Sequence, residues 1–264
     1  MKTYTVNDLI KSIRKVGIDR GDTIFILPEI YKFGILENTQ FNDEMYEIFF
    51  KVIKEIIGPK GTICINSYTF DTLRFKKKFY YDKPVSTCGG FSNYILSLKK
   101  TIRSHHPAFS VASIGHKAKF ISQNNSFHNY GYNSPYEKFI RLKGKILNLG
   151  SDYVINPFNH VAEYMVGIPY YFNKYYNFQI IKNNKVKRQE FTSFVRYLDI
   201  ELVSEVKKLK KEIKKNKILK SSKLGESFVY CCNVKKYYDI CVNLLTKDQL
   251  SLINKKKYLM SLKD

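Results

Sequence analysis

The pattern that limits the possible folds most strongly is an alternation of short, mostly apolar runs with longer amphipathic segments. One apolar run occupies residues 23–27, apolar residues recur three and four apart over 42–57, and a second apolar run occupies 62–65. Short apolar runs are typical of buried strands, whereas the three-and-four spacing predicts a helix. Strands that alternate with helices predict an α/β fold.

The same alternation continues along the rest of the chain. Asn183-Asn184 separates two strand-like runs, 178–181 and one that begins near Val186, which predicts a β-hairpin. Because the chain has no internal repeat and no linker rich in Pro, Gly or Ser, we expect a single domain over 1–264, with 181–264 as its lysine-rich C-terminal portion. The other expected elements are helices at 6–16, 91–100, 135–142, from about 159, within 206–220 and as a final pair, and strands at 111–114, 146–149 and 227–230.

The chain is strongly basic, with 45 Lys and Arg against 23 Asp and Glu and a formal net charge of +22. The charge is densest in 181–264, where Leu202, Val206, Leu209 and Ile213 form an apolar helical stripe opposite lysines. This pattern suits an anionic cofactor, a nucleic acid or an anionic membrane, and equally a solvated helix face. Aromatic residues are not interleaved among these lysines as in single-strand binders, so nucleic acid is not the partner we expect.

The sequence also restricts the compartment. No apolar run approaches the roughly 20 residues that span a bilayer, and the N-terminus lacks the apolar stretch of a signal peptide. The five cysteines are odd in number and include no CxxC pair, so neither a disulfide framework nor a metal site is expected. These features favour a cytoplasmic protein.

Three groups of residues could carry chemistry. His160-Val-Ala-Glu163 places an imidazole and a carboxylate on one helical face after the strand 146–149, where Asn159 could cap the helix. Arg103-Ser-His-His-Pro107 could hold a phosphate or a carbonyl group, or could be a turn fixed by its proline. Cys88, just before an expected helix, could be a nucleophile with a lowered pKa or a small packing residue. We expect Cys231 and Cys232 to pack in a strand.

Motifs of several other enzyme classes do not occur. The chain has no GxxxxGK[ST], GxGxxG, GxSxG or HExxH. Nucleotide hydrolysis, dinucleotide redox chemistry, α/β-hydrolase chemistry and zinc-protease chemistry therefore have no support in the sequence.

Six blocks of the chain resemble, in order, those of the aminoglycoside 3-N-acetyltransferase family. The first is Gly21-Asp-Thr, and the second is Gly58-Pro-Lys-Gly-Thr-Ile63. The others are Arg103-Ser-His-His-Pro107 with Ser110 and Gly115, Gly131-Tyr-Asn-Ser-Pro135, Gly144-Lys-Ile-Leu-Asn-Leu-Gly150, and His160-Val-Ala-Glu163. The blocks cover roughly residues 20–165, whereas the tail from Leu224-Gly225 onward is a weaker match.

The resemblance implies a mixed sheet flanked by helices, with a basic helical C-terminal part. It also implies acetyl-CoA as co-substrate and a primary amine of an amino sugar as acceptor. Carried onto this chain, it makes His160 the general base and Glu163 its partner. It further implies that Arg103, Ser104 and Glu29 bind the cofactor, and that His106 and Asp152 bind the substrate.

The chain departs from the family pattern in the predicted site. Leu27-Pro-Glu-Ile30 stands where the family usually has His-Ser-Ser-Leu, and Pro157 stands where it usually has Thr. An acid expected in the preceding loop falls on Val154, although Asp152 is close by. Lost hydroxyl donors leave three hypotheses: ordinary acetyl transfer with substituted contacts, a different acyl donor, or lost catalysis.

The leading hypothesis is an N-acetyltransferase acting on an amino sugar, either a nucleotide-linked sugar for surface polysaccharide or an aminoglycoside. Because aminoglycosides are polycations and this chain carries +22, its charge favours an anionic acceptor. The alternatives are a non-enzymatic, basic or nucleic-acid-binding protein on the same scaffold and, as a third reading, a Cys88 thiol enzyme. The sequence leaves homo-oligomerisation open.

Overall fold

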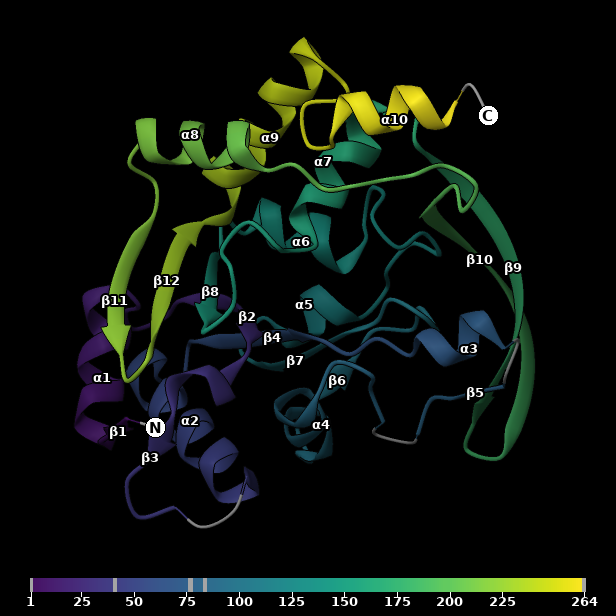
Figure 1. Ribbon diagram of the computed structural model, residues 1–264. Coiled ribbons are helices and arrows are strands. Elements are labelled where there is room, and N and C mark those ends of the chain that lie inside the picture. The colour runs from purple at the N-terminus through teal and green to yellow at the C-terminus, as the bar shows by residue number, and fades with distance from the viewer. Residues whose placement is uncertain (1, 40–41, 76–77, 83–84, 263–264) are drawn as a thin grey trace.

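A seven-stranded mixed sheet forms the centre of the protein (Figure 1). The computed structural model describes residues 2–39, 42–75, 78–82 and 85–262. The neighbouring strands β8, β2 and β4 run parallel, and the strands outside them pair antiparallel. In spatial order the strands are β11 (Lys220–Leu224), β12 (Ser227–Asn233), β8 (Lys145–Leu149), β2 (Thr23–Pro28), β4 (Thr62–Asn66), β7 (Val111–Gly115) and β6 (Ile102–Arg103).

The side chains of β2 show why both faces of the sheet are covered. Ile24 and Ile26 point into one hydrophobic core, and Phe25 and Leu27 point into the other. The first core is covered by α1 (Val6–Lys15), α2 (Asn42–Ile57) and α4 (Gly90–Ser97). The second is covered by α5 (Ala118–Ser122), α6 (Pro135–Arg141), α7 (Phe158–Val166), α8 (Lys207–Lys215), α9 (Val234–Lys247) and α10 (Lys255–Ser261).

A second, three-stranded sheet lies to one side of the central sheet (Figure 1). It consists of β9 (Tyr171–Lys182), β10 (Lys185–Arg196) and β5 (Phe79–Tyr80). Asn183 and Asn184 form the turn between β9 and β10, with φ of 48° and 60°. Asn tolerates this left-handed conformation better than most residues, and two such residues in succession are typical of tight hairpins. The predicted hairpin is confirmed, with strands of 12 residues each.

The predicted α/β class and mixed sheet are confirmed, and the departures from the predicted pattern are local. The lysine-rich helix ends at Lys215 rather than continuing toward Lys220, which instead begins β11. The sequence also did not indicate several short elements: β1 (Thr3–Tyr4), η1 (Ile30–Phe33), β3 (Ile35–Leu36), α3 (Phe70–Arg74), β5, β6 and α5. Elements of two to five residues are too short to show a hydrophobic period.

Cys231 and Cys232 lie on β12 and face opposite cores, in agreement with their predicted packing role. All five cysteines are free thiols. Across the described ranges, none of the helices is both long and apolar enough to cross a membrane.

Candidate active site

The turn that follows β8 directs the chain toward α7. Gly150 adopts φ of +81°, and a Cβ atom there would lie 2.5 Å from the backbone oxygen of Glu29. Only glycine fits both the left-handed backbone and the close approach. The carboxyl ends of the parallel strands β2 and β8 therefore lie against each other where the loop to α7 begins.

The start of α7 differs from the sequence-based prediction. Pro157 occupies the N-cap position, and the helix begins at Phe158. Asn156 accepts the backbone N–H of Phe158 at 3.0 Å, and so takes over part of the capping role. Asn159, predicted as the cap, instead lies inside the first turn, where its side chain bonds the Val154 carbonyl and the Tyr237 hydroxyl.

His160 and Glu163 form a hydrogen-bonded pair one turn apart on α7. Nδ1 of His160 lies 2.6 Å from Oε2 of Glu163. Since a carboxylate accepts hydrogen bonds, Nδ1 is the donor, and in the neutral ring Nε2 carries the lone pair. Within the described residues no hydrogen bond occupies Nε2. The His160 side chain is 37% exposed, and that of Glu163 is 6% exposed. The arrangement fits a general base oriented by a buried carboxylate.

Tyr170 completes this cluster, and the sequence-based reasoning missed it. Its hydroxyl donates to Oε1 of Glu163 at 3.0 Å, and the side chain is fully buried. Both oxygens of the Glu163 carboxylate are therefore bonded, one to each partner. Tyr170 follows the end of α7 by four residues and belongs to no repeating pattern, so no sequence signal could have indicated it.

Aromatic rings surround the His160 imidazole. Tyr130 and Tyr171 lie with ring centroids 5.4 Å and 5.6 Å from it. Burial raises the pKa of both tyrosines. Behind Tyr130, the Tyr136 hydroxyl lies 2.7 Å from that of Tyr68. Burial raises the pKa of all four phenols, so they stay protonated at neutral pH and do not act as bases.

The structure gives Arg103 and Ser104 packing contacts. Arg103 Nε donates to the Ser110 hydroxyl at 2.8 Å, and its Nη2 donates to the Ser67 carbonyl at 2.7 Å. The hydroxyl of Ser104, which is 1% exposed, accepts the Val111 N–H. Burial lowers the pKa of Arg103 to about 10, which leaves it charged at neutral pH. Their role in cofactor binding stays a prediction, and their contacts show how each holds β6 to its neighbours.

His106 is also buried, with 3% of its surface exposed. Its Nδ1 accepts the backbone N–H groups of Ala108 and Phe109, and Nε2 lies 3.4 Å from the Thr192 carbonyl and 3.3 Å from the Ser193 hydroxyl. Burial lowers its pKa to about 3, so the ring is neutral. With both nitrogens engaged, His106 ties the loop to β10, and its role toward substrate stays a prediction.

The structure brings Glu29 and Asp152 to one surface near the carboxyl ends of β2 and β8. Glu29 pairs with Lys32, and Asp152 pairs with Lys210 at 2.7 Å. Asp152 also contributes to raising the pKa of Lys32, after the larger effect of Glu29. Both carboxylates already have a cationic partner there. Their roles toward cofactor and substrate stay predictions.

Cys88 does not have the lowered pKa that the nucleophile hypothesis required. Its thiol is partly buried and accepts the backbone N–H of Tyr68, and burial raises its pKa. The helix that follows begins only at Gly90. Desolvation disfavours the thiolate more strongly than the nearby N–H groups favour it.

The family model and the relatives found by sequence point to one family. The family model of aminoglycoside 3-N-acetyltransferase matches residues 36–246. Aminoglycoside N(3)-acetyltransferase III of Salmonella sp and that of Enterobacter cloacae are each 24% identical to this chain over 184 residues. These alignments cover 63% of this chain and 62% of the relatives' length.

Solved structures share the fold over nearly the whole chain. Aminoglycoside acetyltransferase AAC(3)-IVa, as apoenzyme, has a TM-score of 0.78 at 18% identity and covers 99% of this chain and 97% of its own. AAC-IIIb in a binary complex with CoASH has a TM-score of 0.76 at 17% identity, covering 93% and 97%. YokD from Bacillus subtilis has a TM-score of 0.74 at 17% identity, covering 92% and 100%.

Proposed function

Because the chain belongs to the aminoglycoside 3-N-acetyltransferase family, we propose that it transfers an acetyl group from acetyl-CoA to a primary amine of an amino sugar. The relatives that it matches in sequence are named for acetylation at N3 of aminoglycosides. One structural neighbour is a complex with CoASH, and another is a complex with a gentamicin. The present chain and those neighbours share a fold at 17–20% identity.

The observation that carries the proposal is the His160–Glu163 pair. Glu163 fixes the ring orientation through Nδ1, and Tyr170 fixes Glu163. Nε2 of His160 is thereby left as an acceptor on a side chain that is partly exposed. A base in this state can take a proton from an amine while the amine attacks a carbonyl carbon. The intact pair also argues against the hypothesis of lost catalysis.

In the proposed reaction one proton moves from the amine to the departing sulfur, and His160 alone carries it. Acetyl-CoA supplies the acyl group as a thioester. Nε2 of His160 accepts one proton from the attacking amine as the new C–N bond forms and the C–S bond breaks. Glu163 stabilises the imidazolium that results, since its carboxylate faces the protonated Nδ1. His160 then returns the proton to the departing sulfur, so the enzyme ends in its starting state.

The residues predicted to hold CoA fit its phosphates poorly. Arg103 is 6% exposed and bonded within the protein, and Ser104 is buried as well. Glu29 is an anion already paired with Lys32. A phosphate requires exposed cations or free N–H groups. Beside Glu29 and Asp152 lie their partners Lys32 and Lys210, and a contact of the donor's phosphates with this surface would use these two lysines.

The net charge of the chain favours an anionic acceptor. With a net charge of +22, the protein repels a polycation such as an aminoglycoside at long range. An amino sugar linked to a nucleotide carries phosphates and would be attracted. We therefore propose a nucleotide-linked amino sugar as the acceptor, with an aminoglycoside as the alternative.

The test is the release of CoA thiol from acetyl-CoA with a panel of amino sugars, for wild type, His160→Ala and His116→Ala. His116 is an exposed histidine that lies outside α7, and it serves as the matched control. We expect His160→Ala to lower kcat by about 10²- to 10⁴-fold while CoA still binds, because the base is lost but the donor site is not. A His160→Ala enzyme with nearly full activity would contradict the assignment of the base.

A non-enzymatic, nucleic-acid-binding role is the second candidate, and the exposed lysines of α8 motivate it. Lys208 and Lys210 on this helix pair with Asp248 and Asp152, which reduces the charge they offer to a polyanion. Measuring the binding of an arbitrary duplex DNA at two salt concentrations distinguishes this role from acetyl transfer. Steeply salt-dependent binding without any thiol release would favour this role over acetyl transfer.

A further inference from the structure

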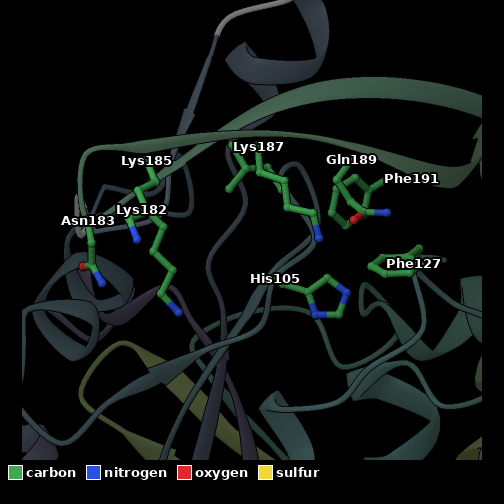
Figure 2. A pocket seen from close by; sticks show the side chains of 9 residues that line it. His105, Phe127, Lys182, Asn183, Lys185, Lys187, Gln189 and Phe191 are labelled. Atoms are coloured by element: carbon green, nitrogen blue, oxygen red, sulfur yellow. The ribbon is translucent and has the colours of Figure 1, made fainter.

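A cavity of about 510 Å³ lies under the far end of the β9–β10 hairpin. Figure 2 shows its lining, with Lys182 and Lys187 extending from the hairpin toward the level of His105. The volume lies within the range of sites for small organic ligands. None of the three residues of the His160, Glu163 and Tyr170 cluster lines this cavity. Its lining residues are His105, Phe127, Ile180, Lys182, Asn183, Lys185, Lys187, Gln189 and Phe191.

The strand register explains why lysines gather here. Lys185 lies directly opposite Lys182 and Lys187 directly opposite Ile180, so these four side chains share one face of the hairpin. The lining contains no carboxylate. No ion pair joins Lys182, Lys185 or Lys187 to a carboxylate of the described residues, and the Asp82 carboxylate nearby accepts the Asn183 backbone N–H. Like charges opposite each other are destabilising, which an anionic ligand would relieve.

One end of the cavity forms an aromatic wall, in which Phe191 lies on the same hairpin face as Lys185 and Lys187. Phe127 and Phe191 contact each other with ring centroids 5.5 Å apart, and the His105 ring lies 5.3 Å and 5.7 Å from them. Nε2 of His105 is buried and has no hydrogen-bond partner in the described part of the chain. A buried polar atom without a partner is costly, so a hydrogen bond from a ligand to this nitrogen would be favourable. The lining of the cavity thus combines three lysines with aromatic rings and one unpartnered, buried nitrogen.

From these features we infer that the cavity binds the nucleoside diphosphate part of a substrate. The lysines would meet the phosphate oxygens, the aromatic wall would meet the base, and His105 would bond a hydroxyl or N–H group of the nucleoside. Two substrates share this chemistry, a nucleotide-linked amino sugar and CoA. The role of such a site as part of a substrate-binding site rests on the proposed function. Binding itself can be measured without turnover.

The hairpin also extends from the cavity to the His160–Glu163 pair. Tyr171, which contacts His160, is at the start of β9, and Phe191 at the edge of the cavity pairs with Tyr176. Five residues of strand separate the two positions, or about 17 Å. A substrate with its diphosphate group in the cavity would therefore have to extend along the hairpin for its reactive end to approach Nε2 of His160.

The experiment is calorimetric titration of the full chain with UDP, ADP, CoA and uridine, for wild type, Lys187→Ala and Arg188→Ala. Arg188 is the next residue on β10 and points to the opposite face, so its replacement removes the same charge outside the cavity. We expect UDP or CoA to bind the wild type, and Lys187→Ala to weaken that binding by about tenfold, as loss of one charged hydrogen bond does. Arg188→Ala should leave it within about twofold, and uridine should bind much more weakly.

The outcomes separate the two sources of the diphosphate. UDP binding that Lys187→Ala weakens and CoA does not displace assigns the cavity to the acceptor. CoA binding that Lys187→Ala weakens, with no binding of UDP, assigns it to the acyl donor. Equal losses in Lys187→Ala and Arg188→Ala would overturn the inference, because net charge alone would then explain binding. Absence of binding by all four compounds would overturn it too, even if the enzyme transferred acetyl groups to an uncharged amino sugar.

Discussion

At the scale of single residues, the Glu163 carboxylate is held from both sides, by His160 and by Tyr170. In Tyr170→Phe one oxygen of a buried carboxylate loses its partner, and the orientation of the imidazole loosens. We expect kcat to fall by about tenfold with little change in KM, because Tyr170 does not itself face the substrate. Steady-state kinetics across pH provides the measurement.

The neighbouring Tyr258 supplies a matched control for that change. Its ring lies 6.0 Å from that of Tyr170, and it does not bond Glu163. Tyr258→Phe should therefore leave kcat unchanged. If the two variants lose activity equally, Tyr170 acts through packing rather than through its hydrogen bond.

Cys88 gives a second prediction at this scale. Its sulfur accepts the Tyr68 N–H, and burial raises its pKa. A serine oxygen can accept the same bond, so Cys88→Ser should retain nearly full activity, and iodoacetamide should label Cys88 slowly at pH 7. The activity assay and mass spectrometry after labelling measure the two quantities. Loss of activity in Cys88→Ser together with fast labelling of Cys88 would indicate a thiol enzyme.

At the scale of elements, the geometry of the site depends on how β8 leads into α7. Gly150 is left-handed and lies close to the Glu29 backbone, whereas Gly167 at the end of α7 is left-handed with nothing near its missing Cβ. Gly167→Ala should cost about 1 kcal/mol of unfolding free energy from backbone strain alone. Gly150→Ala should cost more, up to about 3 kcal/mol or beyond, because a steric clash is added.

Urea denaturation of both variants measures these costs. Only the Gly150 variant should also lower kcat, since its turn positions α7 and therefore His160. Equal losses of stability would mean that the Glu29 backbone moves aside without penalty.

At the scale of the whole molecule, buried histidines make stability depend on pH. His106 has a pKa of about 3 in the folded protein, against 6.5 as its ordinary value, and burial lowers the pKa of His105 and His128 as well. Between pH 6.5 and 3 the unfolded chain binds protons that the folded chain does not. The free energy of unfolding should therefore fall as pH falls through this window, by about 1.4 kcal/mol per pH unit for His106.

Denaturation at several pH values, for wild type, His106→Asn and His116→Asn, checks this dependence. An asparagine oxygen can still accept the Ala108 and Phe109 N–H groups but does not titrate, so the slope should flatten in His106→Asn. His116 is exposed, and its replacement should leave the slope unchanged. An unaltered slope in His106→Asn would mean that other groups control the acid stability.

The amino-acid sequence is enough to predict the order of the main elements and the pairing of His160 with Glu163. Both are local properties. Apolar period distinguishes a strand from a helix within about ten residues. A spacing of three residues on a helix brings two side chains together whatever surrounds that helix. The family motifs pointed to the same pair, and the Asn183-Asn184 turn likewise followed from two adjacent residues.

Which polar residues face solvent, and which are engaged in packing, depends on contacts between separate elements of the fold. Arg103 and His106 have partners at Ser67 and Thr192, and the cavity joins His105 to Lys187. Tyr170 reaches Glu163 from beyond the end of its helix. Such contacts depend on how separate elements pack, and burial then sets the charge state of each group. The spacing of residues along the chain does not predict contacts between elements that come together only on folding.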